Sequence, residues 1–195
     1  MKPFDIYLCG VGGQGIGLLA EVLGAACRRA GHVVRGCDTH GLAQRHGVVA
    51  SHLRLGESAL AARVAPASAQ LVLALERLEA LRAATLMLGQ GGTLIYYDAV
   101  YQPIHVRMGR AAYPGREEVV AAVAARGGRV ESVPAEGLAD PRLANAALLG
   151  RLAALETVPC LARALLAETL AGAVPAPLRE ANLAAFEAGA RLLEI

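Results

Sequence analysis

The sequence has no tryptophan, few aromatic residues and only four cysteines among 195 residues. The cysteines, Cys9, Cys27, Cys37 and Cys160, form no CxxC pair. Iron–sulfur clusters and structural zinc need several thiolates, commonly from closely spaced cysteines, so we expect neither in this chain. Free cysteines are usually buried as small apolar side chains, and we expect that role here rather than a disulfide framework.

Long hydrophobic runs and blocks of one charge are also missing. Hydrophobic residues make up 55% of the chain, but many are alanines and no stretch approaches the ~20 strongly apolar residues of a membrane span. The 19 basic and 17 acidic residues are scattered, which gives no reason to expect nucleic acid or an anionic membrane as partner. With no secretory signal pattern at the amino terminus, we expect a soluble, cytoplasmic protein with a single domain over residues 1–195.

Short apolar runs alternate with segments of helical periodicity. The pattern predicts strands at residues 4–9, 32–38, 48–55, 71–76, 93–100 and 129–134. It predicts helices from Ile16 to Gly31 and at residues 77–88, 116–128, 138–156, 159–172 and 177–193. This order is typical of an α/β fold: a Rossmann-like, mostly parallel sheet flanked by helices, with a helical C-terminal region. The first two strands and the helix between them are expected to form a βαβ unit with a parallel strand pair.

The first predicted strand leads into LCGVGGQGIG, in which Gly10, Gly12 and Gly15 have the GxGxxG spacing. Glycines there allow a tight turn, and the free amides of the following helix favour an anion. Asp38, at the end of the next predicted strand, stands where a ribose-binding carboxylate would. The motif is also explained if the glycines only allow close strand–helix packing and Asp38 is a turn residue. Both interpretations stay open at this point.

Several further segments favour one particular family. GVGGQGI is followed in order by THGLAQRHGVVASHLRLG, ALERLEALR, NAALLG and EANLAAFEAG. Together they resemble the gamma-type domain of the 2-oxoacid:ferredoxin oxidoreductases, and within that family the small subunit of the indolepyruvate type. The resemblance covers nearly the whole chain. GxGGQG combined with HGxAQR is much more specific than GxGxxG alone.

The resemblance implies an enzyme that uses thiamin diphosphate to decarboxylate an aryl 2-oxoacid, passes two electrons through 4Fe–4S clusters to ferredoxin and leaves an acyl-CoA. This chain lacks a GDG-type motif for thiamin diphosphate and magnesium, and it lacks cluster cysteines. These cofactors are therefore expected on a larger alpha partner subunit, and none on this chain alone. CoA is expected as co-substrate, and the chain is expected to be active only with its partner.

Two loops are expected to face the substrate, CoA or the partner. In the HGLAQRHG segment, Arg45 is suited to clamp a carboxylate or phosphate and Gln44 to orient a neutral oxygen. These side chains are equally suited to plain intersubunit hydrogen bonds. The family pattern has glycine where this chain has His46, which tolerates positive φ less well. The predicted site residues are Gly10, Gly12, Gly13, Gln14, Gly15, His40, Gln44, Arg45 and His46.

Other polar residues are weaker candidates for a functional site. His52 and His105 have no second ligand at a metal-like spacing, so we expect no metal site. Glu76 and Glu79 are three residues apart and resemble a carboxylate pair, but Arg77 and Arg82 favour a charged surface or ion pairs.

Three further polar residues are assigned no catalytic role. Asn145 and Asn182 are expected in helix caps or interhelical hydrogen bonds. Ser51 has no identifiable base, so no catalytic triad is predicted and no residue is assigned as catalytic. The alternatives to the family function are a free-standing NAD(P)-binding oxidoreductase and a ligand-free interaction module.

Overall fold

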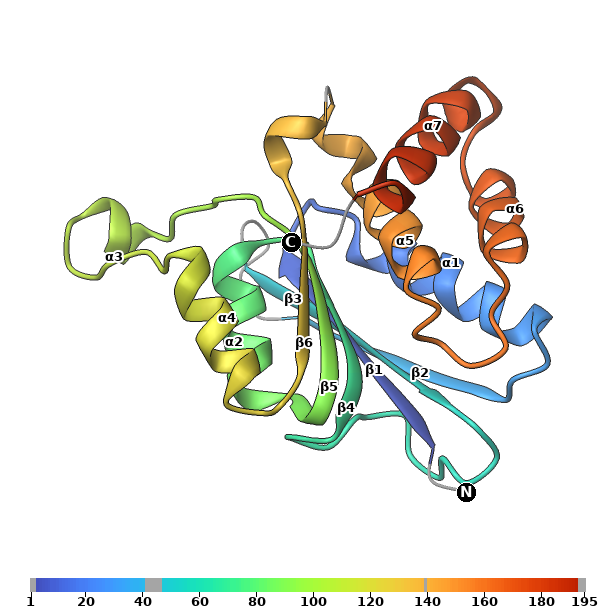
Figure 1. Cartoon of the computed structure of the whole chain (residues 1–195), viewed down its shortest axis with the longest axis horizontal. Coiled ribbons are helices and arrows are strands. Elements are labelled where there is room, and N and C mark those ends of the chain that lie inside the picture. The colour runs from blue at the N-terminus through green and yellow to red at the C-terminus, as the bar shows by residue number, and fades with distance from the viewer. Residues whose placement is uncertain (1–2, 41–46, 139, 193–195) are drawn as a thin grey trace.

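The computed structural model describes residues 3–40, 47–138 and 140–192. Six strands form one sheet in the order β2-β3-β1-β4-β5-β6 (Figure 1). The strands are β1 (Phe4–Val11), β2 (Val34–His40), β3 (Val48–Leu55), β4 (Ala69–Ala74), β5 (Leu88–Tyr97) and β6 (Arg129–Val133).

The sheet is mixed, with parallel pairing of β1 to β4, β4 to β5 and β5 to β6. The expected α/β fold is confirmed, but the expected parallel pairing of the first two strands is wrong. β3 lies between β1 and β2 and runs antiparallel to both. The connection from β2 to β3, residues 41–47, is shorter than the dozen or so residues of a parallel crossover, so β3 must return antiparallel beside β2.

Helices cover both faces of the sheet (Figure 1). One face carries α1 (Ile16–Arg29), α5 (Ala144–Ala154), α6 (Arg163–Ala173) and α7 (Arg179–Ala190), and the other carries α2 (Arg77–Leu86) and α4 (Arg116–Ala124). The short helix α3 (Ile104–Arg107) projects from the body of the molecule. Single-turn 3-10 helices span Ala135–Gly137, Pro141–Leu143 and Ala176–Leu178. No helix of the described ranges is long and apolar enough to cross a membrane.

The central strand β4 shows how the sequence pattern builds two cores. Leu71 and Leu73 face α1 and the C-terminal helices, whereas Val72 and Ala74 face α2 and α4. Alternate residues of a strand point to opposite faces, so a continuous apolar run is buried on both. The strand expected at 71–76 is thus confirmed as β4, which begins at Ala69 and ends at Ala74, so Leu75 and Glu76 fall outside it.

The C-terminal helices pack unusually closely. A Cβ added to Gly150 of α5 would lie 1.9 Å from the carbonyl oxygen of Phe186 in α7, and one added to Gly189 would lie 2.0 Å from that of Ala147. Glycine at both positions lets the two backbones touch, which no larger residue allows. Helix α5 is consequently almost wholly buried between α7, the sheet and α1.

Candidate functional site

The glycine loop turns the chain from β1 into α1. Gly13 and Gly15 have φ values of 100° and 80°, which are left-handed conformations that favour glycine, and Gly15 caps α1. The Gly12 amide donates to the carbonyl of Gly47, 2.9 Å away, just before β3. Gly47, the last residue before β3, therefore lies against the glycine loop.

Gln14 holds this loop from within. Its Oε1 accepts a hydrogen bond of 2.7 Å from the Val11 amide, and its Nε2 donates one of 2.6 Å to the Leu75 carbonyl at the end of β4. The side chain thus fastens the loop to the carboxyl ends of two neighbouring strands. A GxGxxG pattern treats this position as variable, whereas here it carries two hydrogen bonds.

Asn145 fastens the loop from the other side. Its Nδ2 donates to the carbonyl oxygens of Gln14 and Gly15, at 3.3 and 3.1 Å, and the residue is only 6% exposed. The expected interhelical role is therefore confirmed, because Asn145 on α5 bonds to Gly15, the N-cap residue of α1, and to the adjoining Gln14. Asn182 instead donates to the Leu178 carbonyl within its own C-terminal segment, at 2.8 Å. A polar residue at the start of the apolar NAALLG helix was the available signal for Asn145.

A hollow of 360 Å³ opens beside the glycine loop. Its lining includes Gly13, Gly15, Asn145, Tyr97 and Arg142. The first turn of α1 carries no acidic residue, so the partial positive charge of the helix N-terminus is not offset there. Arg142 at the rim forms an ion pair with Asp140 at 2.7 Å. The hollow is electrostatically suited to an anionic group.

Asp38 does not occupy the position of a ribose-binding acid. Its Oδ1 accepts a hydrogen bond of 2.6 Å from Ser51 on β3. The strand register places Asp38 opposite Ser51 on β3, and Ser51 opposite Leu8 on β1. Asp38 is therefore two strand spacings, about 10 Å, from β1. In the expected βαβ unit it would lie on the adjacent strand. The inserted β3 therefore weakens the dinucleotide interpretation.

The second predicted loop is described only at its edges. The register places His40 opposite Val49, and Val49 opposite Gly10, so the end of β2 is level with the glycine loop. Gln44, Arg45 and His46 lie outside the described residues.

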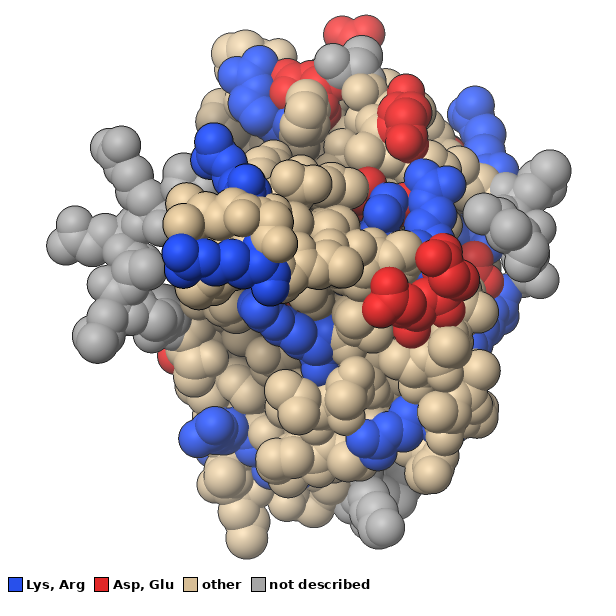
Figure 2. Space-filling model, turned by 90° about the vertical axis from the view of Figure 1, so that its left-hand side faces the viewer, with Lys and Arg blue, Asp and Glu red and all other residues tan. Residues whose placement is uncertain are grey.

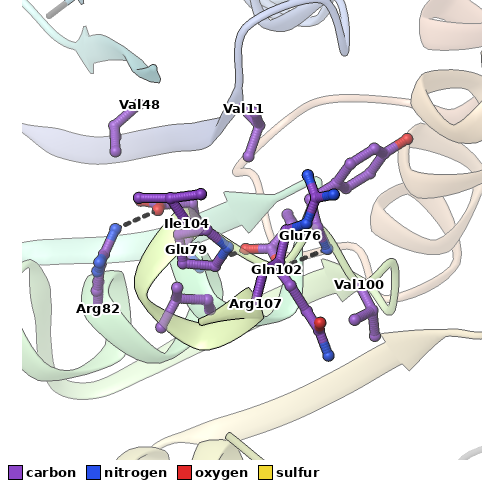
Figure 3. A pocket seen from close by; sticks show the side chains of 12 residues that line it. Val11, Val48, Glu76, Glu79, Arg82, Val100, Gln102, Ile104 and Arg107 are labelled. Atoms are coloured by element: carbon purple, nitrogen blue, oxygen red, sulfur yellow. Dashed lines mark hydrogen bonds and ion pairs between the residues drawn. The ribbon is translucent and has the colours of Figure 1, made fainter. Parts of the chain in front are cut away.

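A larger hollow of 760 Å³ lies on the α2 side of the same sheet edge. Figure 3 shows Val11 and Val48 on the opposite side of this hollow from Val100, with Glu79 and Arg82 joined by an ion pair of 2.6 Å. The two hollows share Val11 and Tyr101 in their linings, so they are neighbours along the carboxyl edge of the sheet. Ligands of open α/β sheets commonly bind at this edge.

Glu76 and Glu79 are not a solvated carboxylate pair, because both are buried. Glu76 caps α2 by accepting from the Glu79 amide at 2.9 Å, and its other oxygen accepts from the Tyr101 amide and the Tyr113 hydroxyl. Burial raises the pKa of both glutamates, opposed at Glu76 by the backbone hydrogen bonds and at Glu79 by Arg82. The predicted ion pairing is confirmed for Glu79 and Arg82, whereas Arg77 pairs with Asp98 at 2.6 Å.

The remaining candidates are structural. His52 is buried in β3, where its Nδ1 accepts from the Val64 amide at 3.2 Å; burial lowers its pKa, with a smaller contribution in the same direction from Arg63. Cys9 and Cys27 are buried as expected, and burial raises the pKa of Cys27 to about 12, whereas Cys37 is half-buried and the expected burial is wrong for Cys160, which is exposed. Within the described ranges, no three His, Cys, Asp or Glu residues converge as metal ligands. The described cysteines therefore do not fit an iron–sulfur cluster.

Taken together, the fold and the site define an α/β protein whose glycine loop lies at the carboxyl edge of the sheet, beside a helix N-terminus that carries no acidic residue. Residues 5–192 match the family described as pyruvate ferredoxin/flavodoxin oxidoreductase. The chain belongs to this family, which confirms the predicted membership of the 2-oxoacid:ferredoxin oxidoreductases.

Similar sequences cover nearly the whole chain. The indolepyruvate oxidoreductase subunit IorB of Thermococcus kodakarensis is 35% identical, with 98% of this chain and 96% of the relative covered. The subunits of the same name from Pyrococcus horikoshii and Methanothermobacter thermautotrophicus are 34% and 32% identical, covering 98% and 95% of this chain and 96% and 95% of the relatives.

Solved structures share the fold. The gamma subunit of a keto/oxoacid ferredoxin oxidoreductase from Geobacter sulfurreducens has a TM-score of 0.64 at 18% identity, with 96% of each chain covered. The pyruvate oxidoreductase subunit PORC of Thermotoga maritima has a TM-score of 0.66 at 20% identity, covering 97% of this chain and 96% of that one. A 2-oxoglutarate:ferredoxin oxidoreductase from Magnetococcus marinus matches 100% of this chain with 32% of its own, with a TM-score of 0.66 at 20% identity.

Proposed function

We propose that this chain is the small subunit of an indolepyruvate-type 2-oxoacid:ferredoxin oxidoreductase in the cytoplasm. The enzyme would oxidatively decarboxylate an aryl pyruvate to the acyl-CoA and reduce ferredoxin. The observation that carries this proposal is the match to IorB subunits over nearly the full length of both chains. The Magnetococcus structure, in which the same fold makes up 32% of a longer chain, supports a role beside a larger protein.

In this proposal the larger alpha subunit carries thiamin diphosphate, magnesium and the 4Fe–4S clusters. The described part of this chain offers no converging metal ligands, and its buried Cys9 and Cys27 lie in separate elements. We therefore assign no redox or decarboxylation step to its residues.

The contribution proposed for this chain is to bind an anionic group of CoA or of the partner at the glycine loop. The left-handed Gly13 and Gly15 turn the chain so that the first amides of α1 are not used within the helix. Gln14 and Asn145 fix that geometry through the hydrogen bonds described above. A phosphate of CoA fits the charge of the site and its 360 Å³ hollow. His40, Gln44, Arg45 and His46 remain proposed contacts from the β2–β3 connection.

Anaerobic reconstitution with the larger subunit tests the proposal. We expect ferredoxin reduction that depends on indolepyruvate, on CoA and on both subunits, and Arg45→Ala is expected to raise the KM for CoA about tenfold. Isothermal titration of the isolated chain with CoA, NAD and NADP tests the alternative. Tight NAD binding would favour a free-standing dehydrogenase, and isolation of the native chain without any thiamin-bearing partner would remove the subunit proposal.

A further inference from the structure

A thirteen-residue segment projects from the sheet edge beside the larger hollow. We call residues 100–112, which include α3, the arm (Figure 1). No residue of the arm is buried, and none of the side chains of α3 packs into either core. The free energy of folding within this chain therefore gains little from the arm's apolar side chains.

The base of the arm is nevertheless held firmly. Asp98, just before it, accepts hydrogen bonds from Arg77 and from Arg116, which lies beyond its far end. Glu76 accepts from the Tyr101 amide and from the Tyr113 hydroxyl, one at each end of the arm. Two buried carboxylates thus fasten both ends to the start of α2. The arm is thus anchored at both ends.

The surface of the arm is apolar. Four of the ten large hydrophobic side chains that are exposed in the described residues lie on it: Val100, Tyr101, Ile104 and Met108. A fifth, Val48, lies across the hollow (Figure 3). Ile104 is 60% exposed. Such clustering in a short segment marks an interaction surface, whereas single exposed apolar residues do not.

The charge of the arm has one sign. It contains His105, Arg107 and Arg110, and no aspartate or glutamate. Figure 2 shows the side of the molecule on which α3 projects, with basic side chains across its left and middle and acidic ones along its top and its right-hand part. A symmetric contact with a second copy would bring these arginines together, which like-charge repulsion disfavours. The partner surface should instead carry carboxylates.

We propose that the arm and the 760 Å³ hollow beside it form the docking surface for the larger subunit, which presents an apolar side chain flanked by carboxylates. This proposal rests on the proposed function. Ile104, Met108 and Tyr101 would bury their exposed area in the interface, as anchor residues do. Arg107 and Arg110 would pair with the partner's carboxylates at the rim, which orients the encounter and makes it sensitive to salt.

The experiment measures the Kd between the full-length chain and the cofactor-loaded larger subunit under anaerobic conditions. Two double variants change the arm: Ile104→Asp with Met108→Asp, and Arg107→Glu with Arg110→Glu. Matched controls change exposed residues at the start of α7, Leu178→Asp and Arg179→Glu. Melting curves establish that each variant is folded, which the exposure of these side chains leads us to expect.

We expect each arm variant to weaken binding at least tenfold and the controls to change the Kd less than about twofold. The arginine variant should also bind with a flatter dependence on salt concentration. Folded arm variants that bind as tightly as the wild type would overturn the docking surface alone. Arm variants that lose CoA affinity but keep their partner would also overturn it, and would show the hollow to be a small-molecule site. If the wild-type chain binds no larger subunit, the proposed function itself falls.

Discussion

The glycine loop and the arm leave the same edge of the sheet but are built in opposite ways. The glycine loop follows β1 and is covered: Gln14 bonds it to β4, Asn145 bonds it to α5, and Gly12 bonds it to the β2–β3 connection. The arm follows β5, is held only at its two ends by Glu76 and Asp98, and buries no side chain. The glycine loop after β1 presents backbone amides, whereas the arm after β5 presents side chains.

This difference indicates where substitutions should act. Changes in the glycine loop disturb hydrogen bonds and packing inside the chain, so they should lower the free energy of unfolding. Side-chain changes at the tip of the arm remove no contact with either core, so they should act mainly on binding. Paired substitutions of the same residue type in both regions test this division.

The largest effect is expected from Gly15→Ala compared with Gly109→Ala. Both glycines have positive φ, 80° and 69°, so alanine at either position carries a backbone cost of about 1–2 kcal/mol. At Gly15 the new Cβ would also lie 2.7 Å from Asn145 Nδ2, whereas at Gly109 nothing lies within 4 Å. Displacing Asn145 removes its hydrogen bonds to the Gln14 and Gly15 carbonyls, of which the Gly15 carbonyl still accepts from the Leu19 amide at 3.0 Å, and we expect a total loss of about 3 kcal/mol at Gly15. Urea denaturation of both variants measures the difference, and equal losses would contradict it.

A smaller effect is expected from Gln14→Leu compared with Gln102→Leu. Leucine at position 14 removes the bonds to the Val11 amide and the Leu75 carbonyl, which should cost about 2 kcal/mol. Gln102 is exposed on the arm, and its replacement should change the free energy of unfolding by less than about 0.5 kcal/mol. Denaturant titration again gives both values. A loss at Gln102 as large as that at Gln14 would show that the arm is part of the folded core.

The smallest effect concerns Glu79, at the floor of the hollow beside the arm. Burial raises its pKa above the ordinary 4.5. Well below pH 4.5 the Glu79 carboxyl is protonated in both the folded and the unfolded chain. As the pH rises from 4.5 through the raised folded pKa, the unfolded chain ionises first and the free energy of unfolding falls. Glu79→Gln removes the part of this fall that comes from Glu79, so the free energy of unfolding of the variant should depend less on pH than that of the wild type.

Denaturation of the wild type and of Glu79→Gln at a series of pH values across that window checks the prediction. Glu76 shifts in the same direction and stays in place, so the variant should flatten the pH dependence only in part. Arg107→Gln, which changes a charge on the arm, serves as the control and should leave the slope as in the wild type. Parallel curves for Glu79→Gln and the wild type would show that Glu79 ionises equally in both states.

Much of the fold could be predicted from the sequence because each strand is a local apolar pattern. The expected strand at 48–55 coincides with β3, and the expected run at 4–9 lies within β1. Strand order could not be obtained in this way, because it depends on pairing between distant segments. The short connection at 41–47 was the overlooked signal, since it forces an antiparallel return.

Part of the candidate site could also be predicted, because some of its residues form a local sequence motif. The glycine motif and Gln14 stand out locally, and the family resemblance connects them to HGLAQR. The hydrogen bonds from Asn145 to the glycine loop join residues that are 130 and 131 positions apart in the sequence. Hydrophobic periodicity is a local pattern and does not predict a contact between such distant residues. The arm was missed because it has neither alternating nor helical spacing. Its anchor Glu76 was predicted as a possible surface charge, although its place three residues before Glu79, at the start of a helix, is typical of a cap.

The close packing of Gly150 and Gly189 has a consequence for the order in which the molecule is made. During synthesis the glycine loop leaves the ribosome well before Asn145, which fastens it and belongs to α5. That helix is buried only once α7, near the end of the chain, has packed against it. The motif that identifies the family is therefore completed last, and a nascent chain arrested before α7 should expose a loop that does not yet hold its shape.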